Sequence, residues 1–359
     1  MLYLTIGPFF VAARNGAVAF DIAIKPFLGA DTNQQLVLGV FTVLFFAVSY
    51  WLSVSPGKLV DRVGKVLTPA LLVTIAILVV YAAIYPMAPL QALAPDYAAS
   101  PLTKGLIEGY GTMDALASLV FAIIVIDAVR GMGYEKKEEV ISLTARAGII
   151  AIAFLAIVYA FVAYLGATSV GQIGLQENGA DVLAKSAHFY FGAVGNVLLA
   201  VIVLLACIST SVGLITSCGE YFSRLLPRVS YRGWIIIFTL ISLLLANVGL
   251  SAMIKFAVPA LMLLYPMTMV LIMLAFLNNL FDGRRLVYGI TILGTLPVAL
   301  VDGWRTLHSL LAGGDDAWIM QLDGMLKINL PLYSYGLGWI LPSAVAFVVG
   351  VILSKVIKK

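Results

Sequence analysis

The chain has 359 residues, of which 62% are hydrophobic and 11% are charged, and its formal net charge is +4. Soluble domains carry about 25% charged residues. A mean hydropathy of +1.04 therefore excludes a soluble globular protein and predicts an all-α polytopic membrane protein. The basic residues lie in short connections, which argues against nucleic-acid binding. The expected partner of most of the surface is the lipid bilayer.

Ten segments are long enough to span a bilayer, which takes about 20 apolar residues. Together they predict a single transmembrane transporter domain over residues 1–359. The predicted spans are Leu2–Ile24, Leu36–Val54, Leu67–Tyr85, Leu102–Val129, Ile141–Leu165, Phe189–Phe222, Trp234–Leu250, Ala252–Leu277, Leu286–Val301 and Tyr335–Ile357. The longer polar connections are Gln91–Pro101, Gly166–Ala187 and Trp304–Ser334.

The charges of the connections predict the orientation, because cytoplasmic loops concentrate lysine and arginine. Alternate connections and the C-terminal tail hold fifteen Lys and Arg residues, and the opposite connections hold six. This alternation predicts that both termini are cytoplasmic.

The first span contains a charge of each sign, Arg14 and Asp21. They are seven residues apart, about two helical turns, so both lie on one side of the helix. One interpretation is a structural ion pair against neighbouring helices, and the other is a role in lining a permeation pathway. The chain also opens almost directly into this span, which fits either a natural start or a chain that has lost upstream spans.

The stretch Gly105–Phe121, inside the fourth span, contains three glycines and the carboxylates Glu108 and Asp114. Exposed backbone groups and charges in hydrocarbon each cost several kcal/mol. We therefore expect a discontinuous helix that is broken at Gly109–Thr112 and faces a cavity. Freed carbonyls there can coordinate a cation, and freed N–H groups can hold a carboxylate. The alternative is a glycine-rich helix crossing whose polar groups are satisfied.

Adjacent hydroxyls, Ser209 and Thr210, lie in the middle of the sixth span. They offer two oxygen ligands to a small hard cation such as Na⁺. The alternative is close helix packing, since Ser209, Gly213 and Ser217 follow one another at four-residue spacing.

Several phrases of the sequence resemble one family, the branched-chain amino acid:cation symporters, which are the bacterial system II carriers for leucine, isoleucine and valine. The phrases are Gly7-Pro8-Phe9-Phe10, Ser55-Pro56-Gly57-Lys58 through Gly64-Lys65-Val66-Leu67-Thr68-Pro69, Glu108-Gly109-Tyr110-Gly111-Thr112-Met113-Asp114-Ala115-Leu116, Ala206-Cys207-Ile208-Ser209-Thr210-Ser211-Val212-Gly213-Leu214-Ile215 and Tyr265-Pro266.

The resemblance implies a twelve-span carrier of the LeuT-like type, built on an inverted pair of five-helix repeats. This chain would begin at the family's third span, so the architecture would be incomplete at the N-terminus. Ser209 and Thr210 would fall where related carriers place sodium-ligating hydroxyls. The chain departs from the family in having Ala13-Arg14-Asn15 for Pro-Arg-Thr and Asp21 for Glu, and neither change removes a charge.

The function predicted on this basis is import of branched-chain amino acids across the bacterial inner membrane, in symport with Na⁺ or H⁺. No cofactor and no enzymatic activity are expected. The alternative is an N-terminally truncated fragment that does not transport. The predicted substrate contacts are Gly109, Tyr110, Gly111, Thr112 and Asp114, with Phe9 and Phe10 as further candidates; the cation ligands are Ser209 and Thr210; the intramembrane charges are Arg14, Asp21 and Glu108.

Overall fold

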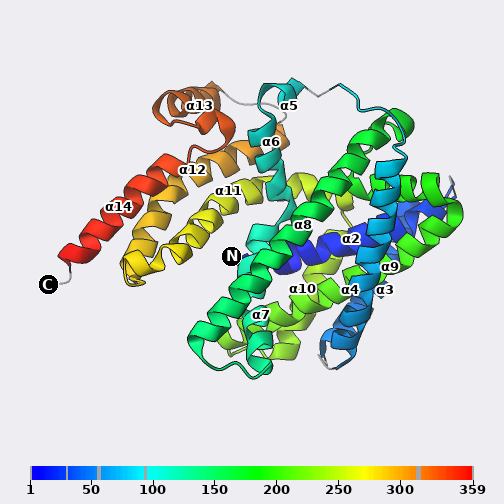
Figure 1. Ribbon diagram of the computed structural model, residues 1–359, viewed down its shortest axis with the longest axis horizontal. Helices are drawn as coiled ribbons and strands as arrows, with labels where there is room; N and C mark the ends of the chain where they lie inside the picture. Colours follow the sequence, from blue (N-terminus) through cyan, green and yellow to red (C-terminus); the bar gives the residue numbers. More distant parts are fainter. Residues whose placement is uncertain (1, 30, 55–57, 93–94, 313–316, 358–359) are drawn as a thin grey trace. The chain divides into compact units, whose positions relative to one another are not determined.

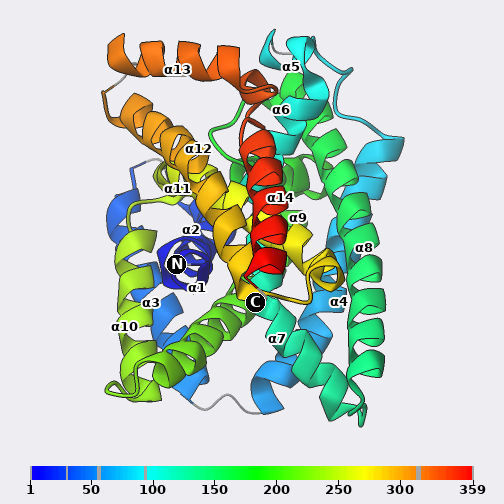
Figure 2. The ribbon, with the colours of Figure 1, turned by 90° about the vertical axis from the view of Figure 1, so that its left-hand side faces the viewer.

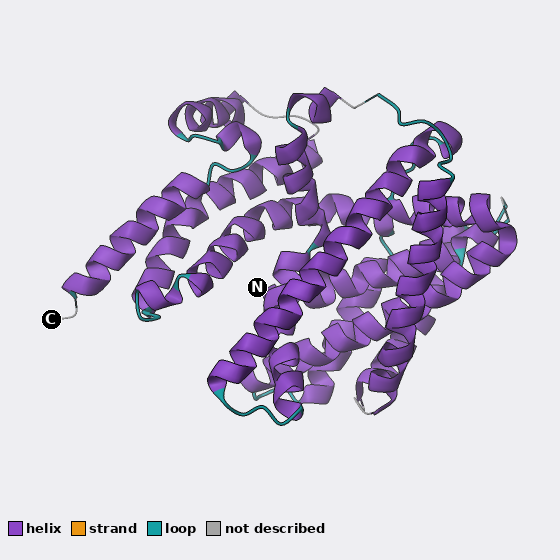
Figure 3. Ribbon diagram, in the orientation of Figure 1, coloured by secondary structure: helices purple, strands orange, loops and turns teal. Residues whose placement is uncertain are grey.

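The computed structural model of the chain describes residues 2–29, 31–54, 58–92, 95–312 and 317–357. The regular secondary structure of these residues is helical throughout (Figure 3), which confirms the all-α prediction. Residues 55–57, in one of the family phrases, lie outside the described residues. The helices are α1 Leu2–Leu4, η1 Thr5–Phe9, α2 Val11–Ala23, η2 Lys25–Phe27, α3 Gln34–Val54, α4 Lys58–Ile84, α5 Pro95–Ala99, α6 Pro101–Glu108, η3 Gly109–Thr112, α7 Asp114–Gly131, α8 Lys137–Ile173, α9 Gly179–Leu225, α10 Tyr231–Ala246, α11 Leu250–Phe276, η4 Asn278–Leu280, α12 Arg285–Ala312, α13 Ala317–Asn329, η5 Tyr333–Tyr335 and α14 Ile340–Val356.

Among the described residues, five helices are long and apolar enough to cross a membrane: α3, α8, α9, α11 and α12. The pair formed by Pro101–Thr112 and α7 passes the same test when it is counted as one broken span. The segment Leu72–Ile84 of α4, α10 and α14 are shorter apolar helices. These lengths support a multi-pass membrane protein, and the count of ten spans stays a prediction.

Two predicted boundaries are wrong. The ninth predicted span ended at Val301, but α12 continues to Ala312. Hydropathy falls at Asp302, yet this side chain is partly buried, so the helix continues past it. Gly166–Ala187 was predicted as a polar connection, but α8 continues to Ile173 and α9 begins at Gly179.

The short link between α8 and α9 is set by local backbone chemistry. Gly174 follows α8 with a φ of 71°, a conformation that glycine adopts at little cost. The Asn178 side chain then caps α9 by accepting hydrogen bonds from the N–H groups of Ala180 and Asp181, at 3.0 and 3.1 Å. Within α9, Gly192 has a φ of 60° and a ψ of −147°, which bends the 47-residue helix.

The chain divides into two compact units: unit 1 comprises Met1–Ala92 and Val120–Met253, and unit 2 comprises Leu93–Leu119 and Ile254–Lys359. In unit 1, α2 packs against α9, α10 and α3 (Figure 1). Gly16 makes this possible, because a Cβ there would lie 2.9 Å from the Phe46 ring. Small residues of this kind let membrane helices approach closely. Figure 2 shows α3 and α10 side by side in the same unit.

In unit 2, α12 and α14 run side by side (Figures 1 and 2). A Cβ at Gly294 would overlap with the Cβ of Ala346. Next to this contact, a 2.8 Å hydrogen bond joins the buried hydroxyls of Thr295 in α12 and Ser343 in α14. α12 also meets α11 at Gly303, since a Cβ there would lie 3.0 Å from the Cβ of Leu263.

Candidate functional site

The helix is interrupted where the sequence predicts it, at Gly109–Thr112. The α-helix α6 ends at Glu108, the 3₁₀ turn η3 covers Gly109–Thr112, and Met113 adopts a left-handed conformation with a φ of 63° before α7 begins. A residue other than glycine in this conformation costs of order 1 kcal/mol and is often found at functional sites. Because α7 starts here, its first N–H groups lie inside an apolar stretch of membrane length.

The backbone of this interruption has open space around it. A Cβ built at Gly105, Gly109 or Gly111 would have no described atom within 4 Å. The Thr112 hydroxyl donates to the Gly109 carbonyl at 2.8 Å, and the N–H of Met113 donates to the Tyr110 carbonyl at 3.1 Å. Among the described residues these glycines therefore have no close neighbour, and both interpretations of the stretch stay open.

An aromatic pair adjoins the interruption within unit 2. The rings of Tyr110 and Tyr265 stack with their centroids 4.1 Å apart and an interplanar angle of 11°, and both side chains are buried. Thr112 and Asp114 also lie beside the Tyr265 hydroxyl. Tyr265 was not among the predicted site residues, although its position before Pro266 in an apolar helix was a usable signal.

Glu108, the second carboxylate of the stretch, forms an ion pair with Lys104 one turn earlier in α6, at 3.0 Å. The Glu108 side chain is half exposed. Pairs with this spacing are local helix interactions worth a few tenths of a kcal/mol. Of the two carboxylates, Asp114 is the one that stands at the start of α7, where a negative charge favours the helix N-terminus.

Phe9 and Phe10 stand at a second irregular point, at the start of unit 1. Residues 5–9 form a π-helical turn, in which Gly7 has a non-helical ψ of −110° and is followed by Pro8. The Phe9 side chain is 38% exposed, and Phe10 is partly buried. These side chains were predicted as substrate contacts, which stays a prediction, but the irregular backbone that carries them was not predicted.

The two charged residues of the first predicted span, Arg14 and Asp21, lie in unit 1. Arg14 is partly buried, and its neighbour Asn15 donates to the Ser211 hydroxyl of α9 at 3.3 Å. Asp21 is buried and accepts a hydrogen bond from the Asn178 side chain at 3.4 Å.

Asp21 also lines a cavity of about 560 Å³ in unit 1, together with Lys25, Asp181 and His188. Lys25 forms an ion pair with Asp181 at 3.0 Å. Burial alone would lower the pKa of Lys25, but the hydrogen bond to Asp181 and the charges of Asp21, Asp181 and Glu177 outweigh it, so this pKa is raised. The Lys25–Asp181 ion pair thus joins the end of the α2 segment to the first turn of α9.

Ser209 and Thr210 lie on α9 in unit 1. The Thr210 hydroxyl donates to the Ala206 carbonyl of its own helix at 2.9 Å, which leaves its oxygen able to act as a ligand. Ser209 is partly buried. A Cβ at Gly213 would have no described atom within 4 Å, and both the cation-ligand and the packing interpretation stay open.

The predicted site residues are therefore divided between the units. Unit 2 holds the interruption, namely Glu108, Gly109, Tyr110, Gly111, Thr112 and Asp114. Unit 1 holds Phe9, Phe10, Arg14, Asp21, Ser209 and Thr210.

Comparison with known proteins identifies the family. A family model described as branched-chain amino acid transport protein matches residues 1–357. The branched-chain amino acid permease BraB of Bacillus subtilis is 43% identical over 99% of this chain and 78% of its own length. The permease BrnQ of Lactobacillus delbrueckii subsp. lactis is 39% identical over 100% of this chain and 80% of its own length.

A branched-chain amino acid transport system 2 carrier protein of Pseudomonas aeruginosa is 39% identical over 100% of this chain and 79% of its own length. These relatives are permeases and a carrier, not enzymes. No solved structure matches the chain. The extent of the family match favours a transporter over a fragment that does not transport, and the chain belongs to the family of branched-chain amino acid transport proteins.

Proposed function

We propose that the chain carries leucine, isoleucine and valine across the cell membrane by symport with Na⁺ or H⁺, with substrate bound at the interruption between α6 and α7. The observation that carries this proposal is the left-handed Met113, which starts α7 in the middle of an apolar stretch. A helix that starts there offers N–H groups and the positive end of its dipole to the carboxylate of an amino acid.

The substrate contacts follow from the chemistry of the interruption. The N–H groups at the start of α7 would hold the substrate carboxylate. The Asp114 carboxylate and the carbonyls of η3 would receive the ammonium group, and the stacked rings of Tyr110 and Tyr265 offer an apolar wall to the side chain. Such a wall discriminates weakly among leucine, isoleucine and valine, because one methylene is worth about 1–3 kcal/mol.

Other parts of the proposal rest on the sequence. Phe9 and Phe10 are further proposed substrate contacts, and Ser209 and Thr210 are proposed cation ligands. Ten spans, a LeuT-like inverted repeat within one transporter domain, cytoplasmic termini and a place in the bacterial inner membrane remain proposals of the same kind. Transport would proceed by alternating access around the interruption.

Uptake of labelled amino acids tests the proposal. The chain would be expressed in cells that lack their own carriers, and uptake of leucine, isoleucine and valine would be measured with and without an inward Na⁺ gradient. We expect saturable uptake of all three and a large loss in an Asp114→Ala variant. The matched control is Asp127→Ala, which removes an exposed carboxylate from the same helix. Equal uptake by Asp114→Ala and the wild type would contradict the proposed site.

A further inference from the structure

The cavity of about 560 Å³ in unit 1 has the size and the lining of a binding site for a small molecule. Such sites measure about 300–1,000 Å³ and combine apolar walls with a few well-placed polar groups. The polar residues in the wall of this cavity include Asp21, Lys25, Asp181, Lys185 and Asn196. The proposed function uses none of these five residues.

The buried part of the wall carries carboxylates. Asp21, in the last turn of α2, is buried and accepts a hydrogen bond from the Asn178 side chain through one oxygen, at 3.4 Å. The same Asn178 amide donates to Asp181 at 3.3 Å, and Lys25 pairs with Asp181 at 3.0 Å. A carboxylate offers about four acceptor positions, so Asp21 can receive further donors. Two carboxylates share one lysine, which leaves this part of the wall with an excess of negative charge.

The exposed part of the wall carries the opposite charge. Lys185 is exposed, and its ammonium group donates to the side-chain oxygen of Gln176 at 2.5 Å. Because that amide is neutral, the contact does not balance the charge of Lys185. His188, which is also exposed, lies one turn further along α9. The two ends of the polar lining thus differ in sign.

A buried acceptor lies on the far side of the bend in α9. Asn196 follows Gly192, where the helix turns, so residues on both sides of the bend line the cavity. The side-chain nitrogen of Asn196 is 3.2 Å from His188 Nδ1, whereas its side-chain oxygen is buried and has no hydrogen-bond partner among the described residues. Buried polar atoms are nearly always hydrogen-bonded, so this acceptor favours a ligand that brings a donor.

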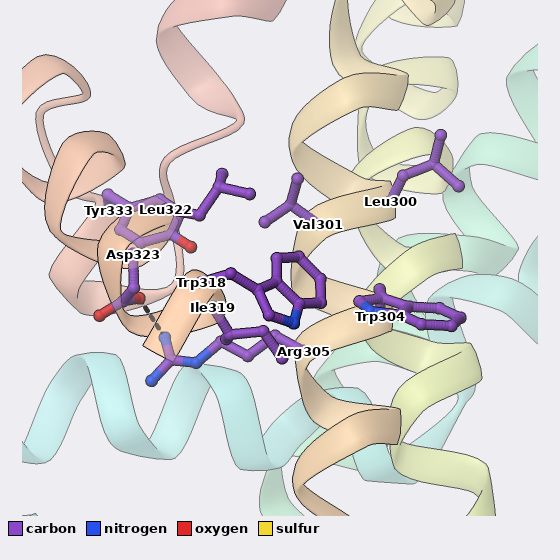
Figure 4. Close-up of a pocket in the computed structure, with 9 residues that line it drawn as sticks. All are labelled: Leu300, Val301, Trp304, Arg305, Trp318, Ile319, Leu322, Asp323 and Tyr333. Carbon is purple, nitrogen blue, oxygen red and sulfur yellow. Dashed lines mark hydrogen bonds and ion pairs between the residues drawn. The ribbon is translucent and has the colours of Figure 1, made fainter. Parts of the chain in front are cut away.

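The pocket of about 150 Å³ in unit 2, lined by residues of α12 and α13, differs in both size and charge (Figure 4). It is smaller than the usual range for ligand sites. Arg305 pairs with Asp323 in its wall, and Lys327 reaches the other Asp323 oxygen at 2.7 Å. Its charged groups are therefore paired with one another, whereas the cavity of unit 1 keeps a separation of charge.

We propose that the cavity of unit 1 is a binding site for an amino-acid zwitterion, which places its ammonium group at Asp21 and its carboxylate at Lys185. Its apolar side chain would lie against Ile173 and Phe189, which also line the cavity. This inference rests on the proposed function, because it takes the transported amino acid as the ligand. It adds a second molecule, bound in unit 1, whereas the interruption at Gly109–Thr112 belongs to unit 2.

The charges of the cavity suit a zwitterion better than an ion of one sign. A simple cation would be attracted by Asp21 and Asp181 but repelled by Lys185, and a simple anion would meet the reverse. Lys25 and Lys185 lie in connections that the proposed orientation places opposite the cytoplasmic termini. In that orientation the site would meet amino acids that arrive from outside the cell.

Equilibrium binding of labelled leucine to the full chain, purified in detergent, counts the sites. Gly111→Leu fills the open space beside the interruption, and Asp21→Asn removes the charge that would hold the ammonium group in the cavity. The control Asp127→Asn changes an exposed carboxylate that also lies in unit 1. Saturating leucine fills every site by mass action, so we expect about two molecules per chain in the wild type and in Asp127→Asn. Each of the other variants should bind about half as much, and their combination should bind none.

The outcomes separate this inference from the proposed function. Wild-type binding of a single molecule, which Gly111→Leu abolishes and Asp21→Asn leaves in place, would overturn the inference and keep the proposed function. A single molecule that only Asp21→Asn abolishes would support the inference and overturn the interruption as the substrate site. A wild-type chain that neither binds leucine nor takes it up in cells would overturn the proposed function and this inference with it.

Lys185→Gln provides a readout that does not depend on how Asp21→Asn folds, because Lys185 is exposed. Its binding is measured in the Gly111→Leu background with leucine and with leucinol, which keeps the ammonium group and the side chain but has a hydroxyl in place of the carboxylate. We expect leucine binding to weaken about tenfold and leucinol binding to change less than about twofold, because only leucine offers a carboxylate to the lysine.

The matched control is Lys136→Gln, which changes an exposed lysine at the start of α8 and should alter neither affinity. Equal losses for leucine and leucinol in Lys185→Gln would show that Lys185 supports the fold and not the carboxylate. That result would overturn the inference.

Discussion

Regular helix is interrupted at Thr5–Phe10 in unit 1 and at Gly109–Met113 in unit 2, and the surroundings of the two interruptions differ. In unit 1 the Pro8 carbonyl accepts a hydrogen bond from the buried Ser242 hydroxyl at 3.1 Å, and a Cβ at Gly7 would overlap with the Cys218 sulfur. In unit 2 the glycines have no described atom within 4 Å of a Cβ. An irregular turn that is packed and hydrogen-bonded by its surroundings acts as structure, whereas one with space beside it can receive a ligand.

The largest effect that would test this contrast is a loss of uptake without a loss of stability. Gly111→Leu places a bulky side chain in the open space beside the interruption. We expect leucine uptake to fall about 100-fold, equivalent to about 3 kcal/mol of lost substrate binding. Thermal unfolding in detergent should stay close to that of the wild type. Gly148→Leu in α8, another glycine with open space around it, should leave both properties unchanged.

The opposite result is expected at Gly7. Gly7→Ala should lower the free energy of unfolding by about 1–3 kcal/mol, because its new methyl group overlaps with the Cys218 sulfur. Adding Cys218→Ala removes that sulfur, and the next atom of residue 218 is 3.6 Å away. The double variant should therefore recover most of the loss, measured by denaturation in detergent. Additive losses in this cycle would show that the contact is not responsible.

A smaller difference in the free energy of unfolding is expected between two variants that each remove a hydroxyl bonded to one of the interruptions. Ser242→Ala should cost about 1 kcal/mol or more, because it leaves the buried Pro8 carbonyl without its donor. Thr112→Val removes the hydrogen bond to the Gly109 carbonyl at an exposed position. It should change the free energy of unfolding by less than about 0.5 kcal/mol. Equal costs for the two variants would remove the distinction between the closed and the open turn.

The smallest expected effect concerns the Lys25–Asp181 ion pair, which lies just after the end of α2. The Lys25–Asp181 pair stabilises the folded state below the ordinary lysine pKa of about 10.4, and this contribution is lost as the pH rises through the raised pKa of Lys25. Since the pair is partly exposed, we expect a loss of about 1 kcal/mol at most. Thermal unfolding followed up to alkaline pH would show it, and Asp181→Asn should flatten this part of the profile.

The sequence predicted the open interruption because three glycines and two carboxylates in an apolar stretch leave few other structures. It did not predict that Met113 takes the left-handed conformation, since that residue type gives no such signal. It also missed the closed turn at Gly7 and Pro8, because its partners Ser242 and Cys218 are more than 200 residues away. Such contacts depend on which helices become neighbours.

The helix boundaries show a second limit of the sequence. A hydropathy average ends a span at a charge, so the prediction stopped at Val301, whereas α12 continues for eleven more residues, to Ala312. The Asp302 side chain is only partly buried, and the helix runs on through it. A boundary drawn from average hydropathy therefore marks where the composition changes and not where the helix ends.

The bend at Gly192 sets how much of α9 can lie within a bilayer. A straight helix of 47 residues would be about 70 Å long, more than twice the thickness of the hydrocarbon layer, about 30 Å. By turning the chain there, Gly192 separates the shorter arm, which carries Asp181, Lys185 and His188, from the apolar arm that crosses. The shorter arm therefore need not continue along the axis of the apolar arm, so one positive φ lets a helix of 47 residues use only part of its length for a crossing.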